Sequence, residues 1–77
     1  MISSVEMARR WPVTAARVVL KPGTDHANSW SVLAAAYDEK EALRLVRLAA
    51  LDLSDGDRRK ADALITSTLT GIIDHLL

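Results

Sequence analysis

The helical periodicity of the second half of the chain constrains the fold more than any other feature of the sequence. Polar side chains occupy every fourth position of the last segment: Arg58, Asp62, Thr66, Thr70 and Asp74. The opposite positions are apolar: Ala61, Leu64, Ile65, Leu69, Ile72, Ile73 and Leu76. Two such stripes at helical spacing predict a helix near residues 56–76, and residues 54–57 supply candidate N-cap residues.

A second helix is predicted directly before it, over residues 38–53. Asp38 and Glu41 have the spacing of a capping box, and the segment contains no glycine or proline. Only three residues are polar between Ala42 and Leu53: Arg44, Arg47 and Asp52. Apolar surface therefore surrounds most of this helix, which must be covered on two sides.

The first half of the chain permits two interpretations, and the first is helical. Four polar residues recur at helical spacing: Arg10, Thr14, Arg17 and Lys21. Pro12 suits a first helical turn, and Pro22 ends the element because the residue before a proline is disfavoured in the α region. After a turn over residues 21–25, a helix over residues 26–37 with Asp25 as its cap would bring Trp30 and Leu33 onto one face.

The second interpretation is an α+β fold, with a β-hairpin over residues 13–37 followed by the two helices. Val18, Val19 and Val32 suit strands. However, the runs 13–21 and 29–37 do not alternate polar and apolar residues, and a two-stranded sheet covers two long helices poorly. We therefore expect an all-α fold, a small three- to four-helix bundle that forms one domain over residues 1–77.

The size of the chain favours a homodimer. The sequence has 77 residues and no cysteine, which excludes a disulfide framework and thiolate metal sites. Domains below about 80 residues gain little from one core and often rely on disulfides, metals or oligomerisation. Small residues recur every four positions at Ala63, Ser67 and Gly71, where a second helix could approach closely. We expect these three residues to bind a partner, and a second copy of the chain fits this stripe. The alternative is that the stripe packs against the short N-terminal helix within the same chain.

The sequence does not predict an enzyme, a cofactor or a metal site. His26 and His75 are the only histidines, and each follows an aspartate without a third ligand at ligand spacing. No serine lies in a glycine-flanked elbow, and the three glycines are too far apart for a phosphate loop. The residues offer neither a nucleophile with its base nor a metal set.

Charge is unevenly distributed although the formal net charge is zero. Residues 1–24 carry four bases against Glu6 alone: Arg9, Arg10, Arg17 and Lys21. We expect these four residues to form one basic surface that binds a partner. We also expect Trp11 and Trp30 to anchor the core rather than a binding surface.

Two functions fit these features. The favoured one is a small protein–protein interaction module that acts as a regulator, inhibitor or adaptor. The alternative is a small DNA-binding transcriptional regulator of helix-turn-helix type, in which His26, Asn28, Ser29 and Ser31 would reach base edges. Against DNA binding, no arginine or lysine occurs from Pro22 to Glu39.

The sequence also predicts a cytoplasmic location without membrane contact. The first ten residues lack the basic-then-apolar order of a secretory signal. No apolar run approaches the roughly 20 residues of a membrane span.

Overall fold

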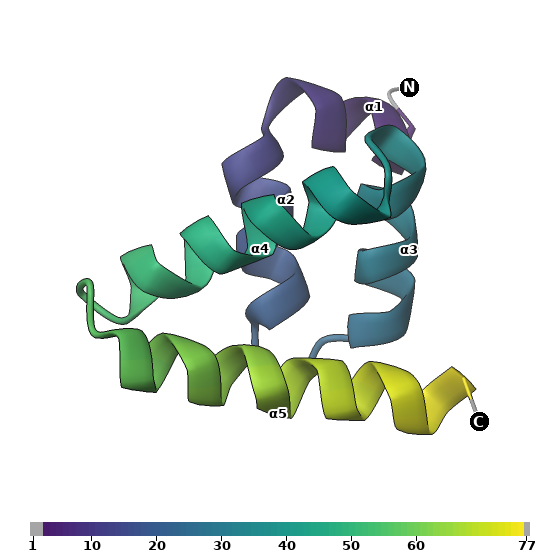
Figure 1. The fold of residues 1–77 in the computed structure, drawn as a ribbon. Coiled ribbons are helices and arrows are strands. Elements are labelled where there is room, and N and C mark those ends of the chain that lie inside the picture. The colour runs from purple at the N-terminus through teal and green to yellow at the C-terminus, as the bar shows by residue number, and fades with distance from the viewer. Residues whose placement is uncertain (1–2, 77) are drawn as a thin grey trace.

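The chain folds into five helices (Figure 1). The computed structural model describes residues 3–76, with side chains described as far as Ile72. The helices are α1 (Ser4–Arg10), α2 (Pro12–Leu20), α3 (His26–Ala36), α4 (Glu39–Leu53) and α5 (Arg58–Leu76). The all-α prediction is confirmed, although the helices number five rather than three or four.

The alternative prediction of a β-hairpin over residues 13–37 is wrong. This segment contains most of α2 and all of α3, and residues 3–76 contain no strand. The physical reason is the spacing of the apolar residues. Ala16, Val19 and Leu20 follow one another at intervals of three and one, so a helix buries all three side chains on one face, which a strand cannot do.

The additional helix, α1, arises because the chain turns at Trp11. Trp11 has φ −130° and ψ 69°, outside the helical region, although its N–H still bonds to Met7 O at 2.9 Å. Pro12 follows as the first residue of α2, where its missing N–H has no helical partner to lose. A capping bond from Glu6 N to Ser3 Oγ, 3.1 Å long, begins α1.

Aspartates begin the three longer helices. Asp25 accepts a hydrogen bond from Asn28 N at 3.1 Å, and Asp38 accepts one from Glu41 N at 2.7 Å, as the sequence predicted for both caps. Asp57 Oδ1 accepts from the N–H groups two and three residues later, at 3.0 and 3.3 Å. The last helix therefore starts at residue 58 rather than near 56.

A tight turn joins α4 to α5. Gly56 N donates to Leu51 O at 2.8 Å and Asp55 N to Asp52 O at 3.3 Å, the bond pattern of a Schellman motif. Asp55 and Gly56 have φ +53° and +80°. The left-handed conformation is unstrained for glycine, but Asp55 adopts it at some cost.

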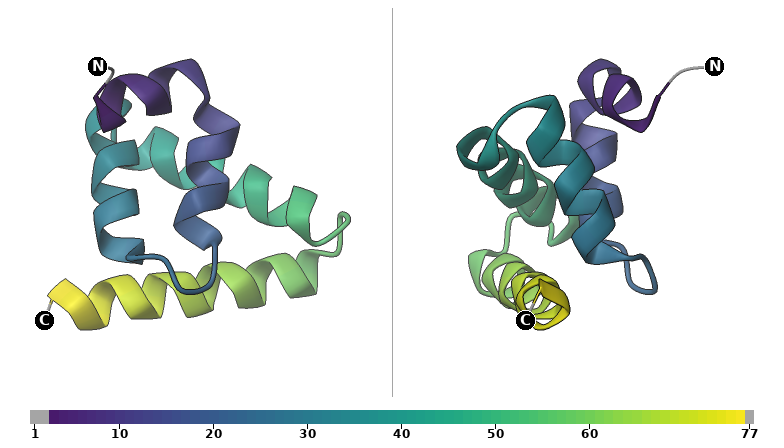
Figure 2. Two further views of the ribbon diagram at one scale, coloured as in Figure 1. Left: turned by 180° about the vertical axis from the view of Figure 1, so that it is seen from behind. Right: turned by 90° about the vertical axis from the view of Figure 1, so that its right-hand side faces the viewer.

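Helices α2 and α3 form an antiparallel pair that organises the rest of the molecule (Figure 1). Helix α4 covers one face of this pair, α5 crosses the end where the two helices are joined, and α1 lies at the other end (Figure 2). The largest fully buried side chains come from α2, α3 and α4: Leu20, Leu33, Val19 and Val46. The core is otherwise rich in alanine, which lets these helices approach one another closely.

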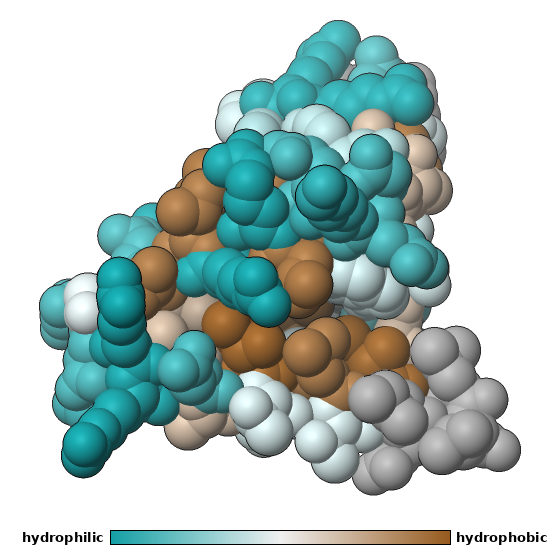
Figure 3. All heavy atoms as spheres, in the orientation of Figure 1, coloured by the Kyte–Doolittle hydropathy of each residue, from teal (hydrophilic) through white to brown (hydrophobic). Residues whose placement is uncertain are grey.

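The prediction that α4 needs cover on two sides agrees with its packing against α2 and α5. Even so, Leu48 and Leu53 remain about half exposed. On the face that carries α4, hydrophobic surface gathers along the seam between α4 and α5, below the hydrophilic side chains of α4 (Figure 3). Within residues 3–76, α4 does not extend over the opposite face of the α2–α3 pair, where α1 lies at one end (Figure 2).

Candidate functional site

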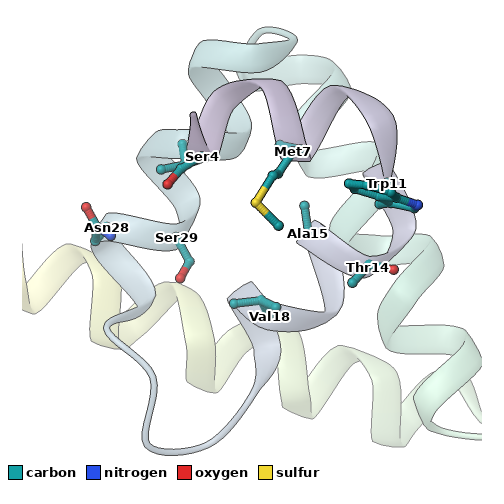
Figure 4. Close-up of a pocket in the computed structure, with 10 residues that line it drawn as sticks. Ser4, Met7, Trp11, Thr14, Ala15, Val18, Asn28 and Ser29 are labelled. Atoms are coloured by element: carbon teal, nitrogen blue, oxygen red, sulfur yellow. The ribbon is translucent and has the colours of Figure 1, made fainter. Parts of the chain in front are cut away.

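A groove of about 550 Å³ opens on the face of the α2–α3 pair that α4 does not cover (Figure 4). Its lining comes from α1 (Ser4, Met7, Ala8, Trp11), α2 (Thr14, Ala15, Val18) and α3 (Asn28, Ser29, Val32). A concave site of this volume is within the range that proteins use to bind apolar groups.

Large apolar side chains form the walls of this groove. Met7, Trp11 and Val18 are 50, 51 and 42 % exposed. Met7 points into the opening from α1, and Val18 lies across it on α2 (Figure 4). Ala8 and Ala15 also line the groove, and they are small enough to let an occupant approach the backbone. Covering the walls would remove apolar surface from water. Each Å² of apolar surface that is buried contributes about 25 cal/mol of favourable free energy.

The polar lining residues determine what chemistry the groove can perform. They are neutral: Ser4, Thr14, Asn28 and Ser29. None of the ten lining residues titrates near neutral pH, so the lining can donate and accept hydrogen bonds but cannot act as a general acid or base. Among the described residues, no three histidine, aspartate or glutamate side chains are grouped to hold a metal ion.

The structure does not bring the four predicted basic residues together on one helix face, because the break at Trp11 separates α1 from α2. Arg9 Nε donates to Ala36 O at the end of α3, at 3.4 Å, and Arg17 pairs with Asp52 on α4. Arg10 lies 3.6 Å from Glu6 on its own helix. Lys21, the C-cap of α2, has no ion pair among the described side chains.

The predicted stripe of small residues lies on the exposed part of α5. Ala63 and Ser67 are exposed. Gly71 lies beside α3, because a Cβ at this glycine would be 3.7 Å from His26 Cδ2. The stripe is therefore open at Ala63 and Ser67 and approaches the body of the protein at Gly71. Its role in binding a partner stays a prediction.

The first turn of α3, the predicted DNA-reading turn, packs against the rest of the molecule. His26 Nδ1 is 2.6 Å from Val19 O, and its ring lies next to Gly71 of α5. Asn28 and Ser29 line the groove, while the Ser31 hydroxyl donates to Ala27 O at 2.9 Å. These four polar side chains do not form one projecting surface. His75 lies outside the described side chains.

An ion pair dominates the exposed surface at the start of α4. Arg44 Nε lies 3.1 Å from both carboxylate oxygens of Glu41, and its Nη2 lies 2.5 Å from one of them. The hydrogen bonds from Arg44 lower the pKa of the Glu41 carboxyl and raise the pKa of the guanidinium. Glu41 was expected to close a capping box on Asp38, but its side chain binds Arg44 instead.

The sequence analysis did not predict the groove, and it assigned one of the lining residues, Trp11, to the core. Trp11 was expected in the core but is half exposed, whereas Trp30 is partly buried against the core as expected. A signal for the groove does exist, because its lining positions in α1 and α2 are separated by steps of three or one: 4, 7, 8, 11, 14, 15 and 18. This is the helical spacing of one continuous face, which persists across the break.

Comparisons of this chain with protein-family models, with curated proteins and with solved structures gave no match. No described helix is long and apolar enough to cross a membrane. The fold and the groove together define a class, a small all-helical protein with an apolar surface groove.

Proposed function

We propose that this protein is a small interaction module that acts as a regulator, inhibitor or adaptor by holding an apolar segment of a partner protein in the groove between α1, α2 and α3. One observation carries the proposal. Three large apolar side chains that are about half exposed, Met7, Trp11 and Val18, line a single opening. Single exposed apolar residues are ordinary, whereas a contiguous apolar patch marks a binding surface.

The secondary structure of the walls favours a helical occupant. An extended peptide binds well when a strand edge pairs with its backbone, but all three walls are helices whose main-chain groups already bond within each helix. A helical segment satisfies its own backbone and needs only side-chain contacts. The small Ala8 and Ala15 leave room for such a helix to approach.

Tryptophan is the residue on which we expect the binding energy to depend most. Interface hot spots are enriched in tryptophan, and truncating one typically costs about 2 kcal/mol or more. Trp11 lies at the junction of α1 and α2 and lines the edge of the groove, so we expect an occupant to contact it. A DNA-binding role draws no comparable support, since His26 is held against Val19 and α5. Cytoplasmic location and dimerisation stay predictions.

Selection of helical peptides tests the proposal. A displayed library of amphipathic helices is selected on the parent protein, and the enriched peptides are then measured against Trp11→Lys, Val18→Lys and the control Leu53→Lys. Leu53 is 52 % exposed but lies on α4, outside the groove. We expect both groove variants to lose at least about tenfold in affinity, about 1.4 kcal/mol, and the control to lose little.

Two results would contradict the proposal. One is equal binding by the groove variants and the parent, and the other is loss of binding in Leu53→Lys alone. Circular dichroism of each variant shows whether the helices remain, so that loss of binding is separated from loss of the fold.

A further inference from the structure

We propose that a second copy of this chain covers the groove when no partner is bound, so that two copies form a two-fold dimer through the groove residues of α1, α2 and α3. This inference rests on the proposed function, because it concerns the same groove. It adds a form of regulation, since a partner helix must then compete with the second copy.

The single chain exposes more surface than a folded monomer of its mass. Its accessible surface is 5342 Å² at a mass of 8.4 kDa. Folded monomers of this mass expose about 4600 Å². The excess of about 700 Å² is close to the roughly 800 Å² that each partner contributes to an interface of standard size. The surplus surface is therefore as large as the area that a stable dimer buries on each subunit.

The core of the single chain is small. None of the three aromatic residues, Trp11, Trp30 and Tyr37, is fully buried, and the largest fully buried side chains are leucines and valines. Domains below about 80 residues gain little from one core, and this chain has no cysteine to form a disulfide. Burial of apolar surface against a second copy would add the stabilisation that the small core does not supply.

The exposed apolar side chains gather at the groove. Among the described side chains, six large apolar ones are exposed, and three of them line the groove: Met7, Trp11 and Val18. Helix α4 covers the α2–α3 pair on the other face (Figure 2). A second copy seated at the groove would therefore place the α2–α3 pair between two layers, as in a larger helical core.

The polar lining of the groove suits contact with an identical surface. In a two-fold dimer the same patch of both copies meets, so a charged lining would repel its own copy. The polar lining residues are neutral: Ser4, Thr14, Asn28 and Ser29. Their hydroxyl and amide groups both donate and accept hydrogen bonds, so the patch can pair with itself. The formal net charge of zero adds no long-range repulsion between copies.

Sedimentation equilibrium of the parent and of four variants tests the inference. We expect the parent to dimerise between about 1 and 100 µM, the range in which weak dimers dissociate. Trp11→Lys and Val18→Lys should each weaken the dimer at least about a hundredfold, because a two-fold interface contains each substitution twice. Two controls lie outside the groove, Leu53→Lys on α4 and Ser67→Leu on α5, and should leave the dimer unchanged.

Amide chemical shifts of the labelled parent locate the contact. On dilution, we expect shifts to change at the groove residues of α1, α2 and α3 and to stay constant on α5. Circular dichroism of each variant shows whether its helices remain. Because Trp11→Lys and Val18→Lys alter different helices or junctions, loss of the fold in one leaves the other as the test.

Competition links the dimer to partner binding. A helical peptide selected on the parent protein should convert the dimer into a monomer with one bound peptide. Its apparent affinity should fall as the protein concentration rises, because the dimer hides the groove. A peptide that occupies the groove of an intact dimer would contradict the shared site.

The outcomes separate this inference from the proposed function. A parent that stays monomeric up to about 100 µM overturns the dimer but leaves peptide binding at the groove to be judged by its own selection. A dimer that survives both groove variants also overturns the inference, and its loss in Ser67→Leu would assign it to α5. Failure of every selected peptide, with a dimer that Trp11→Lys disrupts, overturns the proposed function and leaves the dimer.

Discussion

The hydroxyl of Tyr37, the C-cap of α3, donates to the carbonyl of Ala8 near the end of α1, at 3.0 Å, and lies 3.2 Å from Arg9 O. Arg9 Nε donates in return to Ala36 O at 3.4 Å. These bonds join the C-terminal ends of α1 and α3. They fix a helix of only seven residues that carries the groove residues Met7 and Ala8.

Tyr37→Phe should loosen α1 without unfolding the protein. The substitution keeps the ring but removes the hydroxyl, which costs about 0.5–1.5 kcal/mol for a typical net hydrogen bond. We expect amide hydrogen exchange to accelerate in α1 and to change little in α4. Peptide affinity at the groove should fall as well. Unchanged exchange in α1 would show that the bonds of the Tyr37 hydroxyl do not hold this helix in place.

Leu33→Ala should be severely destabilising. Leu33 is fully buried within the core cluster, and removing such a leucine typically costs about 2–5 kcal/mol because a cavity remains. Leu53→Ala, at a half-exposed position, should change the free energy of unfolding by about 0.5 kcal/mol or less. Urea denaturation measures both. Similar losses of unfolding free energy in the two variants would mean that Leu33 is not packed in the core.

Asp55→Gly should stabilise the turn between α4 and α5. Asp55 has φ +53°, where glycine avoids the steric cost of a Cβ, so we expect a gain of about 0.5–1 kcal/mol. Asp55→Ala is the control, because alanine keeps the Cβ and should give no gain. Thermal unfolding compares them. A loss of stability in Asp55→Gly would indicate a favourable contact of the carboxylate.

Gly71→Ala should also be stabilising. Glycine inside a helix costs about 1 kcal/mol relative to alanine, and the added Cβ would lie at an ordinary contact distance of 3.7 Å from His26 Cδ2. We expect a higher melting temperature with unchanged secondary structure. A lower melting temperature would mean that α5 and α3 cannot accommodate one methyl group.

Self-association through α5 is tested at Ser67. Ser67 is exposed in the middle of the small-residue stripe, whereas a large residue at position 71 would also press on His26. If two copies pack through this stripe, sedimentation should show dimers of the parent and monomers of Ser67→Leu. A monomeric parent at micromolar concentration would disprove the predicted homodimer.

The sequence predicted the long helices and their caps because these depend on local spacing. The periodicities that define α4 and α5 extend over four or more turns, and Asp25 and Asp38 bind N–H groups three residues away. By contrast, α1 spans only seven residues, and so short a helix is not stable without tertiary contacts. Its anchoring partner Tyr37 lies 29 residues from Ala8.

The residues of the candidate site were harder to predict for the same reason. The basic surface was inferred from a helix face assumed to be continuous from Arg10 to Lys21, but the chain breaks at Trp11. Arg17 then faces Asp52, 35 residues away, which no local pattern indicates. The groove exists only because α1 and α4 lie at different sides of the α2–α3 pair, and that arrangement is tertiary.

The hydrogen bonds between α1 and α3 end on backbone carbonyls, which affects which substitutions the groove can tolerate. Tyr37 and Arg9 both donate to backbone carbonyls, and every residue type supplies a carbonyl. Mutations that exchange the wall side chains at positions 7, 11 and 18 therefore leave the attachment of the wall intact. The side chains that line the groove can therefore change while the position of α1 beside α3 stays the same.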